Sequence, residues 1–155
     1  MQLLRAALSW NFVLATAICA SLLAQLIKVL LNLFIFHRFI AERMWGAGGM
    51  PSSHSATVCA MVVATGRYCG VNSPIFAIAA VLSIIVMYDA MGVRYETGEQ
   101  AKVLNRMFTE WMDQGFEQFQ LPHGKKLKEM VGHTPIEVVT GAALGIVLGF
   151  AMPMV

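Results

Sequence analysis

The sequence predicts an all-α bundle that spans a membrane, with about four transmembrane helices and one amphipathic helix at the membrane interface. Hydrophobic residues make up 57% of the 155-residue chain and charged residues 13%, against roughly 25% charged residues in an average soluble domain. The mean hydropathy is +0.65. A soluble domain of this size has too much surface for its volume to bury so many apolar side chains. We therefore treat residues 1–155 as a single membrane domain.

Composition also excludes other classes of protein. An intrinsically disordered chain has few hydrophobic residues and much charge, which is the opposite of this composition. The formal net charge of +2 is too small for a nucleic-acid binder. Cys19, Cys59 and Cys69 lie in apolar runs, and no set of His, Cys and carboxylate residues has the spacing of a zinc site. We expect neither a metal nor a cofactor.

Four apolar segments approach the roughly 20 residues that a membrane helix needs. They cover about residues 8–36, 55–69, 74–91 and 134 to the C-terminus. The second is short for a full span. In the first, Ser21, Gln25, Lys28 and Asn32 share one helix face, and Lys28 is the only cation away from the ends of a predicted span. An ionisable group inside a membrane is costly, so Lys28 is a candidate functional residue.

The only strongly polar stretch covers residues 94–132. Apolar side chains recur there at helical spacing: Val103, Leu104, Met107, Phe108, Trp111, Met112, Phe116 and Phe119. This pattern predicts an amphipathic helix. Such a helix lies in the membrane interface or packs on the bundle, and the sequence leaves both open.

The fourth segment carries Gly141, Gly145 and Gly149, four residues apart and so on one helix face. This spacing allows helices to approach closely in lipid. The partner helix belongs either to the same chain or to a second copy, in which case the glycines would form a homo-oligomer interface.

An alternating path through the membrane brings the unusual polar residues to one side. It places His54, Asp89, Arg94 and His133 at helix ends on the same surface, with Lys28 toward that end of the first helix. Loops 37–50 and 92–132 hold eight Lys and Arg residues, whereas the other side holds Arg5 and Arg67. The positive-inside rule makes this the cytoplasmic side of a cell membrane.

Two short motifs open predicted helices with a histidine beside hydroxyl residues. In residues 48–55, Pro51, Ser52, Ser53 and His54 follow two glycines. The free backbone N–H groups of a helix start bind anions, so this motif is either a phosphate cradle or an ordinary helix start capped by Ser52 or Ser53.

The second of these motifs is residues 132–137. Glu137 lies one helical turn after His133, so the two side chains can meet. A carboxylate on one imidazole nitrogen fixes the tautomer and leaves the other nitrogen to attack or to take a proton. Thr134 adds a hydroxyl to this helix start.

The third motif, residues 88–94, combines an acid and a base. Asp89 lies near a helix C-terminus, where the helix dipole disfavours an anion. Arg94, Lys102 or Lys28 could be its partner. A guanidinium binds phosphate oxygens in a bidentate manner, so Arg94 is a candidate phosphate clamp. Lys102 and Asn105 follow Arg94 by two to three helical turns and could line the same site.

The three motifs together resemble those of the divergent type 2 phosphatidic acid phosphatase family, which is related to acid phosphatases and vanadium haloperoxidases. The resemblance covers nearly the whole chain. It implies that His133 is a nucleophile that forms a phosphohistidine, that His54 protonates the leaving oxygen and that Glu137 orients His133. It requires no metal. The implied activity is a membrane phosphatase that acts on a lipid phosphate or diphosphate.

Two arginine-containing motifs of the wider superfamily are not matched in this sequence. Ile35 and Phe36 follow Lys28 where that superfamily has Arg-Pro, and Leu127 occupies the position of its second arginine. Arg94, Lys102 and Lys28 are then expected to supply the charge, with Ser52, Ser53 and Thr134 as further phosphate ligands and Asp89 and Asn105 in support. Two alternatives remain open. One is a binder or transporter of phospholipid or polyprenyl phosphate that does not catalyse, and the other is a structural subunit.

Overall fold

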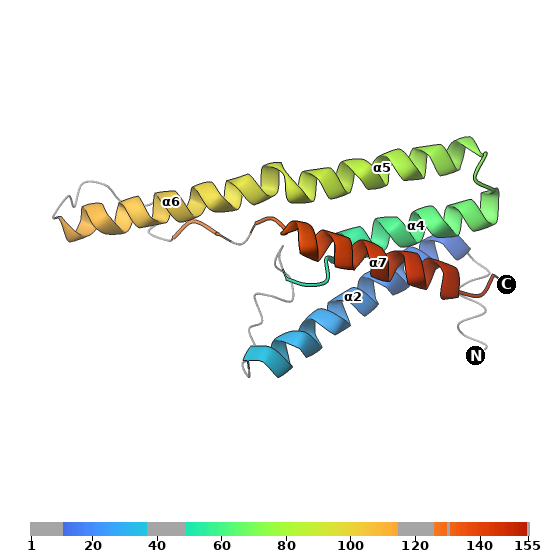
Figure 1. The fold of residues 1–155 in the computed structure, drawn as a ribbon, viewed down its shortest axis with the longest axis horizontal. Helices are drawn as coiled ribbons and strands as arrows, with labels where there is room; N and C mark the ends of the chain where they lie inside the picture. The colour runs from blue at the N-terminus through green and yellow to red at the C-terminus, as the bar shows by residue number, and fades with distance from the viewer. Residues whose placement is uncertain (1–10, 37–48, 115–125, 130, 155) are drawn as a thin grey trace.

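A computed structural model describes residues 11–36, 49–114, 126–129 and 131–154, and these ranges contain helices and no strand. The helices are α2 (Phe12–Phe36), α4 (Ser53–Cys69), α5 (Pro74–Met91), α6 (Val93–Asp113) and α7 (Pro135–Ala151). Figure 1 shows α2, α4, α5 and α7 as a bundle, with α6 extending beyond it.

Helix α4 is the centre of the bundle and packs against α2, α5 and α7. The core between the helices consists of small side chains, and Ala20, Ala24, Ala56 and Ala60 are fully buried. Leu144 and Leu148 of α7 pack against this cluster. Small residues let helix backbones approach closely, which is how helices associate where apolar burial gives no driving force.

The glycine stripe of α7 faces α4 of the same chain. Gly141, Gly145 and Gly149 are buried. A Cβ atom at Gly145 would lie 2.3 Å from the carbonyl oxygen of Ala56, and one at Gly141 would lie 2.3 Å from that of Ser52. The structure thus gives the glycine stripe a partner helix in the same chain, and a homo-oligomer through these glycines stays a prediction.

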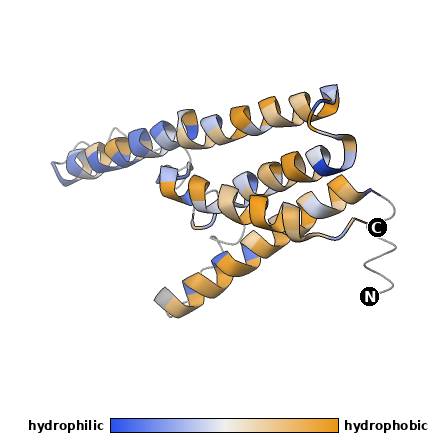
Figure 2. Ribbon diagram, turned by 45° about the vertical axis from the view of Figure 1, so that its right-hand side comes forward, coloured by the Kyte–Doolittle hydropathy of each residue, from blue (hydrophilic) through white to orange (hydrophobic). Residues whose placement is uncertain are grey.

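The outside of the bundle is apolar, as expected of a protein surrounded by lipid. Figure 2 shows hydrophobic residues along α2, α4, α5 and α7 and hydrophilic residues over much of α6. Among the described residues, two helical stretches are long and apolar enough to cross a membrane, α2 and Pro74–Asp113, which α5 and α6 form together, and α7 is a shorter apolar helix. The predicted all-α membrane bundle is confirmed.

Helix α6 continues the direction of α5 and leaves the bundle (Figure 1). Among the helices described, its contacts are with α5 alone, so the alternative that it packs on the bundle is wrong. Six of the eight apolar positions of the predicted amphipathic pattern, from Val103 to Met112, lie in α6, whereas Phe116 and Phe119 lie outside the described residues. Its placement in the membrane interface stays a prediction.

The helix ends follow from local chemistry. The bounds of α5 are those predicted, because Ser73 accepts a hydrogen bond from the backbone N–H of Phe76 and Pro74 opens the helix. Helix α4 begins at Ser53 instead of Ser55, with Ser52 as its cap. At its other end, Arg67 donates to the carbonyl oxygens of Gly149, Phe150 and Met152. This arginine therefore links the end of α4 to the C-terminal end of α7.

Candidate functional site

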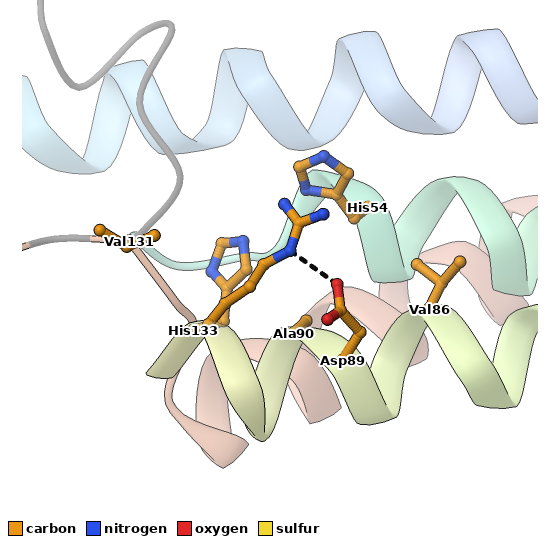
Figure 3. Close-up of a pocket in the computed structure, with 7 residues that line it drawn as sticks. His54, Val86, Asp89, Ala90, Val131 and His133 are labelled. Carbon is orange, nitrogen blue, oxygen red and sulfur yellow. Dashed lines mark hydrogen bonds and ion pairs between the residues drawn. The ribbon is translucent and has the colours of Figure 1, made fainter. Parts of the chain in front are cut away.

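The candidate site lies where the beginning of α4, the end of α5, and the beginnings of α6 and α7 meet. A pocket of about 170 Å³ is open there, lined by His54, Val86, Asp89, Ala90, Arg94, Val131 and His133. Figure 3 shows these side chains around the pocket. This volume is several times that of a water molecule and accommodates a phosphoryl group.

The carboxylate of Glu137 is held at three points. Its Oε2 lies 3.1 Å from Nδ1 of His133 and accepts the backbone N–H of Thr134 at 3.0 Å. Its Oε1 accepts the backbone N–H of Gly49 at 3.2 Å. A carboxylate only accepts hydrogen bonds, so a neutral His133 ring bonded to it has its proton on Nδ1 and its lone pair on Nε2. The predicted pair of His133 and Glu137 is therefore formed.

His133 is fixed from several directions. Its side chain is 3% exposed, and its backbone N–H donates to the carbonyl oxygen of Ala90 at 3.1 Å. Within the described ranges, Nε2 has no hydrogen-bond partner. A buried polar atom without a partner is unusual and costly, and it calls for an explanation. A ligand in the pocket that the ring lines would supply that partner.

The second imidazole is a close neighbour of the first. The ring centroids of His54 and His133 are 6.0 Å apart and the rings are inclined by 61°. His54 lies in the first turn of α4 and is exposed, in contrast to His133. The two rings are close enough to act on opposite sides of one phosphoryl group.

Arg94 brings positive charge to the pocket. Its Nε donates to Oδ2 of Asp89 at 2.6 Å, so Arg94 is the partner that the sequence left open among three cations. The two side chains are 54% and 44% exposed. An exposed ion pair adds little stability, so the bond matters mainly for orientation. It uses Nε and leaves both terminal nitrogens of the guanidinium for an anion.

Two other predicted cations do not line the pocket. Lys28 is 2% exposed and its side chain packs beside Gly49. Its charge is within electrostatic range of Glu137 and His54. Lys102 forms an exposed ion pair with Glu99 on α6, which extends beyond the bundle. Arg94 is therefore the one predicted cation that the structure places at the pocket described.

The three hydroxyl residues that were predicted as phosphate ligands lie at helix N-termini instead. Ser52 is fully buried, and its Oγ accepts the backbone N–H of Ser55 at 3.3 Å. Ser53 is buried in the first turn of α4, and Thr134 is the N-cap of α7. None of these three lines the pocket. The plain reading of residues 48–55 as a capped helix start is thus correct for Ser52.

Sequence reasoning missed the residues that connect the motifs. The bond from Gly49 to Glu137 and the backbone bond from Ser52 to the carbonyl oxygen of Glu137, at 2.9 Å, tie the first motif to the second. Val86 and Val131 form apolar walls. Backbone bonds between distant segments leave no signal in side-chain type, and valine is common in any apolar helix. Among the residues described, no group of three or more His, Cys, Asp or Glu could hold a metal ion.

Comparison with known proteins identifies a family and a relative of the chain. No solved structure matches the chain. The uncharacterized membrane protein YuiD of Bacillus subtilis (strain 168) is 38% identical over 144 residues, which cover 89% of this chain and 91% of YuiD. The sequence profile of the Divergent PAP2 family matches residues 9–148. The match spans the three motifs and the helix ends that surround the pocket, and the chain belongs to the Divergent PAP2 family.

Proposed function

We propose that this membrane protein hydrolyses a lipid phosphate or diphosphate through a phosphohistidine on His133. The observation that supports this most is the state of the His133 ring. Its Nδ1 is bonded to Glu137, and its partnerless Nε2 belongs to a ring that lines the same pocket as His54 and Arg94. A histidine nucleophile needs one ring nitrogen held by a hydrogen bond and the other ring nitrogen free to attack.

In the first step, the lone pair on Nε2 of His133 attacks phosphorus. The P–N bond forms while the bond from phosphorus to the leaving oxygen breaks, and protonated His54 gives its proton to that oxygen. Glu137 stabilises the positive charge that develops on the His133 ring. The guanidinium of Arg94 stabilises charge on the phosphoryl oxygens.

In the second step, water attacks the phosphohistidine. A new P–O bond forms, the P–N bond breaks, and neutral His54 takes the proton from the attacking water. Inorganic phosphate leaves, and both histidines return to their starting states. For a diphosphate, the leaving group of the first step is a lipid monophosphate.

The walls of the pocket support a lipid substrate. Val86 and Ala90 lie on α5, whose next turns expose Leu82 and Ile85 by 46% and 59%. A hydrocarbon tail can lie along this apolar helix while the phosphate lies between the histidines. Purified protein in nanodiscs is expected to release phosphate from phosphatidic acid or a polyprenyl diphosphate faster than from glycerol phosphate. Failure to release phosphate from any lipid phosphate would refute the proposal.

Replacing Arg94 with glutamine is expected to raise KM for the lipid phosphate by roughly tenfold to a hundredfold. Charge-assisted hydrogen bonds contribute about 1.5–3 kcal/mol each, and Arg94 is the cation that lines the pocket. The KM of Arg94→Lys should lie between those of Arg94→Gln and the wild type, because lysine keeps the positive charge but lacks the planar guanidinium that binds two oxygens at once. Arg106→Gln, an exposed position on the same helix, is the control. An equal change in KM for both glutamine variants would contradict a local role for Arg94.

A second candidate function is favoured by the small number of cations. Lys28 and Lys102 do not line the pocket, so a protein that holds a lipid phosphate without cleaving it fits the same geometry. This candidate requires that phosphate or vanadate raise the melting temperature of the wild type but not of Arg94→Gln, with no phosphate released from any lipid. Turnover by the wild type would exclude it.

We further propose that the site faces the cytoplasm of a cell membrane, because the cations of loops 37–50 and 92–132 outnumber those of the other side. The exposed Cys69 lies at the opposite end of α4 from His54. A membrane-impermeant thiol reagent added to intact cells should label Cys69 and spare Glu110→Cys on α6, whereas the reverse pattern would overturn the orientation.

A further inference from the structure

The segment that leads into His133 is fastened along α6. We call residues 126–129 and 131–133 the strap. It is the described part of the chain just before α7, and Figure 1 shows it running beside α6 toward the beginning of α7. Its last residue is His133, so whatever fixes the strap on α6 also fixes one end of the candidate nucleophile.

A single side chain of α6 makes three hydrogen bonds to the strap. Nδ2 of Asn105 donates to the carbonyl oxygen of Leu127 at 2.9 Å and to Oε1 of Glu129 at 2.8 Å. Oδ1 of Asn105 accepts the backbone N–H of Leu127 at 2.9 Å. The amide therefore binds both backbone groups of Leu127, which sets the register of the strap on the helix.

Two glycines let the strap lie directly on α6. A Cβ atom at Gly98 would lie 2.5 Å from the carbonyl oxygen of Glu129. One at Gly132 would lie 2.3 Å from the backbone nitrogen of Tyr95 and 2.7 Å from the carbonyl carbon of Arg94. The strap thus touches α6 next to Arg94, and its register sets where His133 lies relative to that arginine.

Asn105 itself is 5% exposed and does not line the pocket. We propose that Asn105 is a positioning residue, which acts through the strap to hold His133 against Ala90 and across the pocket from Arg94. The kinetic part of this inference rests on the proposed phosphatase function, while the positional part does not. A shift of about 1 Å in a reacting group can cost roughly a hundredfold in rate.

The substitution Asn105→Asp tests the positioning role most specifically. It keeps the shape of the side chain, but a carboxylate donates nothing to the Leu127 carbonyl oxygen or to Glu129, and it brings negative charge toward both acceptors. Glu129→Ala removes one of the three bonds from an exposed position of the strap, so it tests the same idea if Asn105→Asp does not fold. Thr109→Ala is the matched control, because its hydroxyl bonds only the Asn105 backbone carbonyl within α6.

The first measurement needs no activity. Intact protein in nanodiscs is treated with diethyl pyrocarbonate, and modification of His54 and His133 is followed by peptide mass spectrometry. In the wild type, buried His133 should react more slowly than exposed His54. In Asn105→Asp, His133 should react about tenfold faster, because bonds that keep the segment closed have been lost. Glu129→Ala should show a smaller rise, and Thr109→Ala and the His54 rate should not change.

The second measurement separates the two proposals. In an active protein, Asn105→Asp should lower kcat by roughly tenfold to a hundredfold with little change in KM, since binding through Arg94 is kept while the nucleophile is displaced. If the wild type releases no phosphate, the phosphatase proposal fails and the labelling result still tests the strap. If His133 labelling is unchanged in both Asn105→Asp and Glu129→Ala, the positioning role is overturned.

Discussion

Replacing His133 with alanine is expected to lower phosphate release by about a thousandfold or more, as removal of a catalytic nucleophile does. The variant loses the Nε2 atom that would attack phosphorus. The fold should survive, because the helices pack through the small residues of α2, α4 and α7, away from this side chain. The measurement is phosphate release from a lipid phosphate, with circular dichroism as the check on folding. Activity within tenfold of the wild type would remove His133 from the mechanism.

The two histidines can be told apart by the leaving group. His54→Ala loses the proton that the leaving oxygen needs in the first step and the base that accepts the proton of water in the second, which is expected to lower the rate of turnover by roughly a hundredfold to ten-thousandfold. A nitrophenolate leaves without that proton. Release of nitrophenolate in the first turnover with a nitrophenyl phosphate ester should therefore be largely restored in His54→Ala and remain absent in His133→Ala. The opposite result would exchange the roles of the two rings.

The second large effect is expected on stability. Gly145→Val places a branched side chain where a Cβ atom alone would lie 2.3 Å from the Ala56 carbonyl oxygen. That oxygen belongs to a backbone, which cannot turn aside, so α7 must move away from α4. Overpacking a tight contact costs typically about 1–3 kcal/mol and sometimes more. The melting temperature in nanodiscs should fall clearly.

The control lies on the same helix. Ala143 is exposed on α7, and Ala143→Val should leave the melting temperature close to that of the wild type. Because Glu137 lies in the first turn of the helix that moves, Gly145→Val should also weaken the backbone hydrogen bond between Ser52 and Glu137 and lower activity in the protein that remains folded. Equal stability of the two valine variants would mean that the close contact of α4 and α7 is not a main source of stability.

Much of the fold could be predicted because the membrane imposes a strong pattern on sequence. Helix α5 lies between Ser73 and Gly92, where the apolar run stops at either end, and its bounds match the predicted ones. The amphipathic pattern of α6 predicted a helix but not its path. Its buried residues, Gly98, Ala101 and Asn105, include two positions that meet the strap, a segment without periodicity of its own.

The site was predictable to the extent that its residues share a short segment. His133 and Glu137 meet because they are one turn apart, and Asp89 and Arg94 pair across a short junction. The phosphate ligands were harder to predict, because a hydroxyl at a helix start serves equally as a cap and as an anion ligand. In the structure, Ser52 acts as a helix cap. Lys102 follows Arg94 by about two turns in a helix that leaves the bundle, and sequence spacing could not show that departure.

Direct identification of the phosphorylated residue tests the central claim. The wild type is mixed with a lipid phosphate labelled on phosphorus, quenched in alkali, where phosphohistidine is stable, and analysed by peptide mass spectrometry. The account predicts one phosphoryl group on Nε2 of His133, present in His54→Ala with an activated ester and absent in His133→Ala. Phosphate release without any phosphorylated histidine, or with the phosphoryl group on His54, would contradict it.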